Sequence, residues 1–459
     1  MFRALFLTIL SVALTQAVLA AGPGPGAEAA PPAAHGLDPF VLVGVALILV
    51  IGKMGGEVFE RLNQPAVLGE LVGGILVGNL TLVGFSAVDA LKNHEVITAL
   101  AEIGVIVLLF EVGLESNLGE MLEVGWSSLL VAVVGVIAPF FLGWGVAAYF
   151  IREETTLAHI FIGATLTATS VGITARVLKD LGKLATREAR IILGAAVIDD
   201  ILGLLILAVV SGAIKASATG GSLGILEVGV IAVKSLLFLA FAIAAGRFLV
   251  PHLFRGAGRF EGRGVLLSLA ISFCFALAYL ASVVGLAPIV GAFAAGLVLD
   301  EAHFESFQDH KEYGFHQLLV PVSTILVPIF FVLMGLKVDL RSFARPELLG
   351  FAASLTLAAV IGKQVCGLGV VERGINRLAI GFGMVPRGEV GLIFAGIGTT
   401  LFLPNVYGVV EPIISPATFG VVVVMVIITT LFAPPALKLA LSRKPAGERG
   451  PRQVTGSLL

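Results

Sequence analysis

Two adjacent acidic residues lie in the middle of a strongly apolar segment and are the first candidates for chemistry. The segment IILGAAVIDDILGLLILAVV places Asp199 and Asp200 about ten residues, or roughly 15 Å, from the start of the expected helix, near the midplane of a bilayer. A carboxylate at that depth is costly unless it is paired, hydrated or protonated, so such residues usually bind ions or carry protons. Neighbours on a helix point about 100° apart, so these two acids cannot share one partner.

A lysine in another apolar segment is the expected partner of one of these acids. Lys363 lies in the middle of the stretch LAAVIGKQVCG, at a similar expected depth. An ion pair with one aspartate would leave the other to bind a cation or a proton, because a carboxylate in an apolar pocket is stabilised by either. The spacing does not decide which of Asp199 and Asp200 pairs with Lys363.

Two further segments predict helices that are interrupted inside the membrane. In GATLTATSVGITARVL, small and hydroxyl-bearing residues fall in the middle of an apolar span: Thr167, Ala168, Thr169 and Ser170. In GFGMVPRGEVGL, a proline is followed by two charged residues with a glycine between them: Pro386, Arg387, Gly388 and Glu389. Broken helices free backbone groups that can line an ion cavity. Taken alone, the hydroxyls could instead bond to the preceding helical turn, and the arginine could neutralise either the nearby glutamate or the carbonyl end of a half-helix.

The composition indicates that most of the chain lies in lipid. Of its 459 residues, 58% are hydrophobic and 13% are charged, whereas soluble chains average roughly 25% charged residues. The formal net charge of −2 provides no excess of positive charge for binding nucleic acid. The alternating strands of a membrane β-barrel are absent from the sequence pattern. The two cysteines lie inside apolar runs, which excludes a disulfide framework or a CxxC metal site, and no cofactor is expected.

The elements that must position these residues are about 13 transmembrane helices, which makes the fold class an all-α membrane protein. A spanning helix needs about 20 apolar residues. The expected spans cover residues 40–58, 66–84, 97–114, 126–150, 157–178, 191–211, 228–248, 265–281, 286–299, 318–336, 348–370, 378–402 and 413–437. Residues 1–20 are typical of a signal peptide and 21–38 of a disordered extracytoplasmic tail, followed by one membrane domain (39–438) and a cytoplasmic tail (439–459). An N-terminus outside the cell places about 19 of the 29 basic residues on the inner side.

Three short motifs recur in the same order along the chain. The glycine spacing of residues 67–76 returns in 289–298, the end of the third span (109–115) resembles that of the tenth (331–337), and 170–173 resembles 389–392. Each match is offset by seven helices, and an odd offset makes the second copy enter the membrane from the opposite side. The pattern therefore predicts an inverted-topology repeat, with convergent apolar composition as the alternative.

These segments together resemble the monovalent cation:proton antiporter superfamily, second branch, and are similar to bacterial Na+/H+ antiporters of the NapA type. The resemblance rests on QPAVLGELVGGILVG, TATSVG, VIDDILGL, GLAPIVGAFAAGLVL, the GK of the eleventh span and PRGEVGL. It implies a homodimer whose moving core contains two crossed, discontinuous helices, with residues 167–170 and 386–389 at the crossing. It also implies that Asp200 binds the transported cation while Asp199 pairs with Lys363.

The function expected from these residues is secondary active exchange of a monovalent cation, Na+ or Li+ with K+ as an alternative, for protons. The cation and the proton would compete for the aspartate pair, and two acids with one lysine favour electrogenic exchange. The site is expected in the inner membrane of a bacterium, among lipids and without nucleic acid. A cation channel would need rings of carbonyls or carboxylates, and an intramembrane aspartyl protease would need facing carboxylates, so a transporter is favoured over a channel or an enzyme.

Overall fold

The computed structural model describes residues 38–84, 88–115, 125–183, 186–218, 225–257, 264–299, 315–404 and 409–442. Within these ranges the chain is helical almost throughout, which confirms the expected all-α membrane protein. The expected signal peptide and most of both terminal tails lie outside the described residues. Among the described residues, nine helices are long and apolar enough to cross a membrane: α2 (Pro39–Arg61), α5 (Glu95–Glu115), α7 (Trp126–Phe150), α10 (Arg187–Ala218), α11 (Ile225–Ala257), α12 (Val265–Val283), α14 (Phe315–Leu336), α15 (Pro346–Val365) and α18 (Pro416–Ser442).

The four remaining expected spans contain shorter helices. Two of them hold a single short helix each, α3 (Ala66–Gly78) and α13 (Pro288–Val298). The other two are interrupted, as the sequence predicts, and consist of α8 (Thr156–Thr165) with α9 (Val171–Asp180), and of α16 (Arg377–Gly383) with α17 (Gly388–Gly398). Every expected span is therefore helical, and two of them are broken within the membrane.

Three expected spans end in an element other than an α-helix. The span 66–84 stops as an α-helix at Gly78 and continues as the 3-10 helix η1 (Leu80–Val83). The span 348–370 changes after Val365 to the 3-10 helix η5 (Cys366–Gly369), whose sequence CGLG contains two glycines. The end of the span 378–402 is wrong, because Phe402 begins the strand β1 (Phe402–Pro404), which pairs antiparallel with β2 (Val410–Pro412). A proline at the end of each strand has no N–H and cannot continue a helix there. Two short elements on the chain, α4 (Asp89–Lys92) and η4 (Leu340–Ala344), connect spans.

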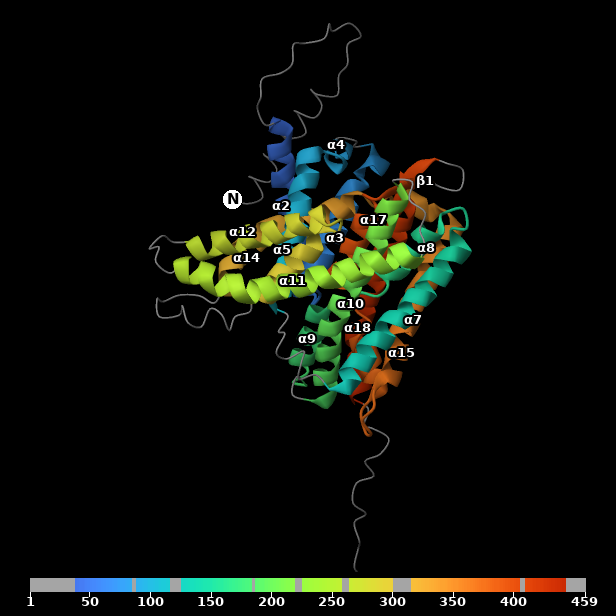
Figure 1. The fold of residues 1–459 in the computed structure, drawn as a ribbon. Helices are drawn as coiled ribbons and strands as arrows, with labels where there is room; N and C mark the ends of the chain where they lie inside the picture. The colour runs from blue at the N-terminus through green and yellow to red at the C-terminus, as the bar shows by residue number, and fades with distance from the viewer. Residues whose placement is uncertain are drawn as a thin grey trace, which may run out of the picture.

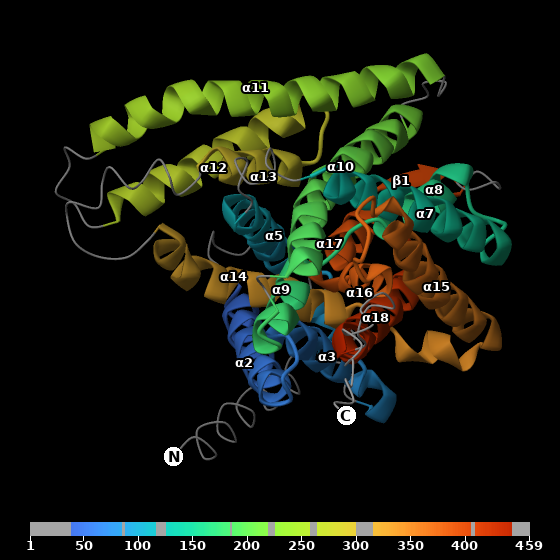
Figure 2. The same cartoon turned by 90° about the horizontal axis from the view of Figure 1, so that it is seen from below.

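The helices divide into two groups by their contacts. The first group contains α2, α3, α5, α12, α13 and α14, and the second contains α7 to α10 and α15 to α18. Between the groups, α10 contacts α13 and α17 contacts α3. The long helix α11 lies beside α12 and α13 and also contacts α10. It crosses the front of the molecule in Figure 1 and lies along one edge in Figure 2. Each group thus combines three spans from the first half of the chain with three from the second half.

This arrangement is that of an inverted repeat, and the recurring glycines mark its equivalent crossings. Gly74 of α3 meets Gly335 of α14, where a Cβ added to Gly74 would lie 2.9 Å from the Gly335 Cα. Gly113 of α5 meets Gly296 of α13 in the same way, at 3.1 Å. Each crossing joins one helix from the first half of the chain to one helix from the second half. Small residues at these positions let the helix backbones approach closely.

Candidate functional site

A fully buried ion pair joins α10 to α15 in the second group. Lys363 Nζ donates to both carboxylate oxygens of Asp199, at 3.0 and 3.1 Å, and both side chains are 0% exposed. Two other polar groups act on this pair, because the Thr169 hydroxyl is within hydrogen-bonding reach of the Asp199 carboxylate and the Arg387 charge acts on it electrostatically. The sequence left the partner of Lys363 open between two aspartates, and in the structure Lys363 contacts Asp199.

Asp200 is the next residue of α10 and has a different environment. Its side chain retains 6% of its surface exposed, whereas that of Asp199 has none. Successive side chains on a helix diverge by about 100°, so Asp200 leaves the axis away from the Lys363 ammonium. The two adjacent acids therefore differ in exposure, and Asp200 is the one that keeps some exposed surface.

The break between α8 and α9 contains threonine hydroxyls that bond to main-chain carbonyls. The hydroxyls of Thr165 and Thr167 donate to the carbonyls of Ile162 and Ala164, at 2.7 and 2.8 Å. For these two threonines the interpretation as bonds to the preceding turn is correct. Thr169 differs, because its hydroxyl donates across the gap to the Met384 carbonyl at 3.4 Å.

The second break, between α16 and α17, lies directly against the first. The Ser170 amide donates to the Pro386 carbonyl at 2.8 Å, which joins the two interruptions through the main chain. Thr174, one turn into α9, donates through its hydroxyl to the Gly383 carbonyl at 2.6 Å. The expected crossing of two discontinuous helices is therefore present, and each helix satisfies carbonyl groups that the break in the other leaves free.

Arg387 neutralises the carbonyl end of a half-helix. Its guanidinium is 0% exposed, and Nη1 donates to the Ala168 carbonyl at 2.5 Å while Nη2 donates to Ala359 of α15 at 3.3 Å. A positive charge is favourable at the carboxyl end of a helix, where unpaired carbonyls carry partial negative charge. The Glu389 side chain, the other partner considered from the sequence, lies outside the described residues, although its backbone belongs to the first turn of α17.

Gly388 has a backbone conformation that suits glycine. Its φ is +36°, and a Cβ at this position would lie 2.5 Å from both Cβ and Oγ of Ser170. Pro386 and Gly388 therefore act together, since the first removes a backbone donor and the second allows the two breaks to touch. The sequence had singled out both residues for these properties.

Thr174 belongs to the crossing but was not among the residues predicted from the sequence. It lies one helical turn after Ser170 in the same polar stretch, TATSVGITA, so continued hydroxyl spacing was the available signal. The carbonyl of Ala359 is a second omission, and no side-chain pattern could have identified it because it is a backbone group.

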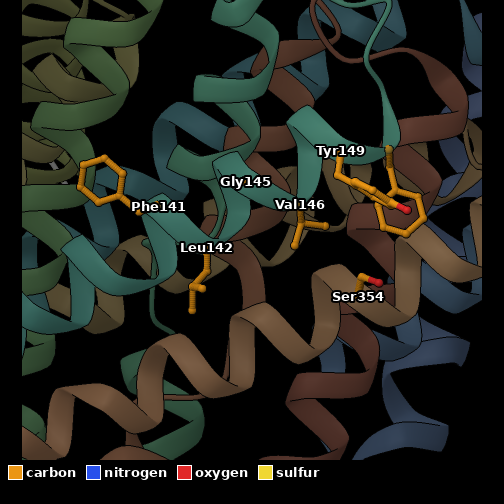
Figure 3. A pocket seen from close by; sticks show the side chains of 7 residues that line it. Phe141, Leu142, Gly145, Val146, Tyr149 and Ser354 are labelled. Carbon is orange, nitrogen blue, oxygen red and sulfur yellow. The ribbon is translucent and has the colours of Figure 1, made fainter.

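The main surface hollow lies away from the crossing, and no candidate metal-binding cluster is found among the described residues. An open apolar hollow of about 460 Å³ lies between α7 and α15, and Figure 3 shows its lining side chains, including Phe141, Tyr149 and Ser354. It contains none of the residues of the crossing. Over the described part of the chain, no group of three or more His, Cys, Asp or Glu side chains is placed to hold a metal ion.

Comparison with known proteins agrees with this architecture. Residues 45–443 match the family described as sodium/hydrogen exchanger, transmembrane. The chain is 41% identical over 440 residues to the high-affinity Na(+)/H(+) antiporter NhaS3 of Synechocystis sp., covering 88% of this chain and 91% of that protein. It is 35% identical over 405 residues to the Na(+)/H(+)-K(+) antiporter GerN of Bacillus cereus, covering 87% and 96%.

A solved structure shares the fold at low sequence identity. The sodium proton antiporter MjNhaP1 from Methanocaldococcus jannaschii matches with a TM-score of 0.67 and 18% identity, covering 88% of this chain and 98% of the other. At this identity the likeness concerns the fold alone. The resemblance that the sequence motifs indicated is confirmed at the level of the family.

Proposed function

The chain belongs to the sodium/hydrogen exchanger family, and we propose that it exchanges a monovalent cation for protons across a membrane by secondary active transport. The observation that carries this proposal is the pair of adjacent acids on α10, of which Asp199 is held by Lys363 while Asp200 is the more accessible. Both lie at the crossing of two broken helices. The names of the relatives NhaS3 and GerN, both Na(+)/H(+) antiporters, support the same function.

In the proposed mechanism Asp200 is the shared binding group. A carboxylate binds a cation only when it is ionised, so a loaded site holds either the cation or a proton but never both. Asp199 and Lys363 form an ion pair beside it, and Arg387 adds a second positive charge. Competition for one carboxylate is sufficient to couple the two fluxes.

The proposed motion is a displacement of the second helix group against the first. Within the second group the two breaks are joined by the bonds from Ser170, Thr169, Thr174 and Arg387. Direct contacts between the groups are few, chiefly α10 with α13 and α17 with α3, and α11 contacts elements of both groups. A group that is tied internally and loosely attached externally can move as a unit, which is how many transporters expose a fixed site to each side in turn.

Charge balance supports electrogenic exchange. Asp199, Asp200, Lys363 and Arg387 sum to zero when both acids are ionised, so a bound monovalent cation leaves one net positive charge. If Asp199 also exchanges a proton as its bond to Lys363 changes, more than one proton moves for each cation. We propose this stoichiometry together with Na+ or Li+ as the preferred ion.

K+ is the second candidate cation, because the relative GerN is a Na(+)/H(+)-K(+) antiporter. A proteolytic role is disfavoured, since catalysis by two carboxylates requires that they face a common water, whereas here they diverge from one helix and one is bound to lysine. A channel would need carbonyl or carboxylate rings around a continuous pore. The relatives named above are transporters rather than enzymes.

The proposed setting is the inner membrane of a bacterium, as a homodimer surrounded by lipid. The start of α2 and the end of α18 lie at opposite ends of the molecule in Figure 1, as an odd number of crossings requires. The excess of basic residues on one side supports an N-terminus outside the cell and a C-terminus in the cytoplasm.

The experiment is proton flux in everted membrane vesicles after addition of Na+, Li+ or K+. We expect wild type to respond to at least one cation and Asp200→Asn to lose that response while remaining folded. Asp89→Asn is the matched control, because Asp89 is a half-exposed aspartate that pairs with Lys92 on the surface, and it should retain wild-type flux. Full cation-dependent flux in Asp200→Asn would contradict the proposal.

A further inference from the structure

A second buried acid lies outside the crossing, in the first helix group. Glu70 of α3 is only 5% exposed. Among the described residues no group donates a hydrogen bond to its Oε2 atom, which is itself buried. An ionised carboxylate without compensating bonds is strongly unfavourable in such a place, whereas a protonated carboxyl is tolerated much better. The burial therefore favours a bound proton on Glu70.

The helices around Glu70 carry little charge that could stabilise its ionised form instead. Its stem lies beside Gly52 of α2, which in turn contacts Pro328 and Val332 of α14. Between residues 318 and 336 α14 has no titratable side chain. On α2 the charged groups that act on Glu70 are Lys53 and Glu60, of opposite sign and both exposed. On α17, which also contacts α3, the acid is Glu389, whose side chain is not among those described.

The inverted repeat shows that this packing does not require a carboxyl group. Matching Gly69 with Gly291 and Gly74 with Gly296 aligns Glu70 with Ala292 of α13. Ala292 is 0% exposed and occupies the equivalent interface of α13 with α5 and α12. Since a methyl group fills the equivalent position, the carboxyl of Glu70 contributes something other than shape.

We propose that Glu70 is a second proton-binding site of this protein, in the helix group that lacks the aspartate pair. With its proton bound, α3 packs closely against α2 and α14. Loss of the proton places a charge in that contact, which requires water and loosens α3. Because α3 contacts α17, whose first residue Gly388 lies at the crossing, this loosening eases the movement of the second group and accelerates exchange at alkaline pH. Only this last step depends on the proposed function.

Proton binding itself can be measured without transport. Infrared difference spectra of the purified full chain between acid and alkaline pH report the C=O stretch of protonated carboxyl groups. We expect one such band to disappear in Glu70→Gln and to remain in Glu57→Gln, the control, since Glu57 is an exposed acid of α2 that pairs with Arg61. Glu70→Ala copies the residue at the equivalent repeat position and provides a second folded variant. An unchanged band in both Glu70 variants would overturn the proposal.

The effect on exchange is tested by the pH profile of cation-evoked proton flux. At pH values below the pKa of a single carboxyl group, its ionised fraction rises about tenfold for each pH unit. We expect the wild-type flux to increase with pH in the same range. Glu70→Gln should match wild type at acid pH and lack the alkaline increase, whereas Glu57→Gln should retain it. An identical profile in Glu70→Gln would overturn the link to exchange. If wild type shows no cation-evoked flux, the proposed function fails while the infrared result still decides proton binding.

Discussion

Removing the buried ammonium of Lys363 is expected to destabilise the protein substantially. In Lys363→Met the side chain keeps its length, but Asp199 loses both of its bonds to Nζ, at 3.0 and 3.1 Å, in a site with no exposure. Breaking a fully buried ion pair by removing one partner costs about 3–5 kcal/mol, because the other charge is left uncompensated. The Thr169 hydroxyl and the Arg387 charge still stabilise the Asp199 carboxylate, so we expect the lower end of this range.

The assay is a double-mutant cycle of thermal unfolding in detergent with Lys363→Met, Asp199→Asn and the double variant. The double variant should be more stable than Lys363→Met, because it buries no unpaired charge. Arg61→Met is the control, since Arg61 and Glu57 form an ion pair whose side chains are 78% and 58% exposed. An exposed pair of this kind contributes about 0.2–1 kcal/mol.

Two results would refute this reasoning. The first is a loss in Lys363→Met no greater than that in Arg61→Met, because the buried pair would then contribute no more than a surface pair. The second is a double variant as unstable as Lys363→Met, which would show that the ammonium is needed for contacts other than that with Asp199.

Two further predictions concern the crossing and the surface beyond it. Gly388→Ala should lower thermal stability and cation-evoked flux more than Gly84→Ala, because both residues have positive φ but only at Gly388 does the added Cβ meet a neighbour, Ser170; equal losses would show that backbone strain alone decides. Burial and the nearby Glu411 charge raise the pKa of Glu154 above its usual range, so the folded protein holds this proton more tightly than the unfolded chain and stability falls as pH rises from the ordinary glutamate range. Glu154→Gln should remove that fall in thermal unfolding measured from acid to neutral pH, and a persistent fall would assign it to other groups.

The architecture follows from the sequence where the physics is local. The length of an apolar run fixes whether a helix can span the membrane, and proline or glycine with polar neighbours marks where a span breaks. These two rules predicted breaks at residues 167–170 and 386–389, within the spans 157–178 and 378–402. In the structure the helices are interrupted at residues 166–170 and 384–387. The inverted repeat was visible because close helix crossings need glycine, and those glycines keep their spacing in both halves.

Features that depend on distant segments could not be predicted in the same way. Whether Lys363 meets Asp199 or Asp200 depends on the rotation of α10 relative to α15, which are far apart in the sequence. The burial of Glu70 results from α14, which begins more than two hundred residues later, so a single acid near the start of a span gave no sign of it. The strand at Phe402 was missed because a short apolar run continues a helix and starts a strand equally well.

The bonds at the crossing indicate why the two breaks occur as a pair. A single interrupted helix would leave carbonyl groups without donors in an apolar interior, which is costly. Here the side chains of one broken helix supply the donors for the other, since Thr169 and Thr174 donate to carbonyls at the end of α16, while Arg387 donates to Ala168 after α8. Each break is therefore stable only while the other is in place. An ion site built on such mutual bonds resists internal rearrangement, so access to Asp200 has to change through movement of the whole group rather than through refolding of either helix.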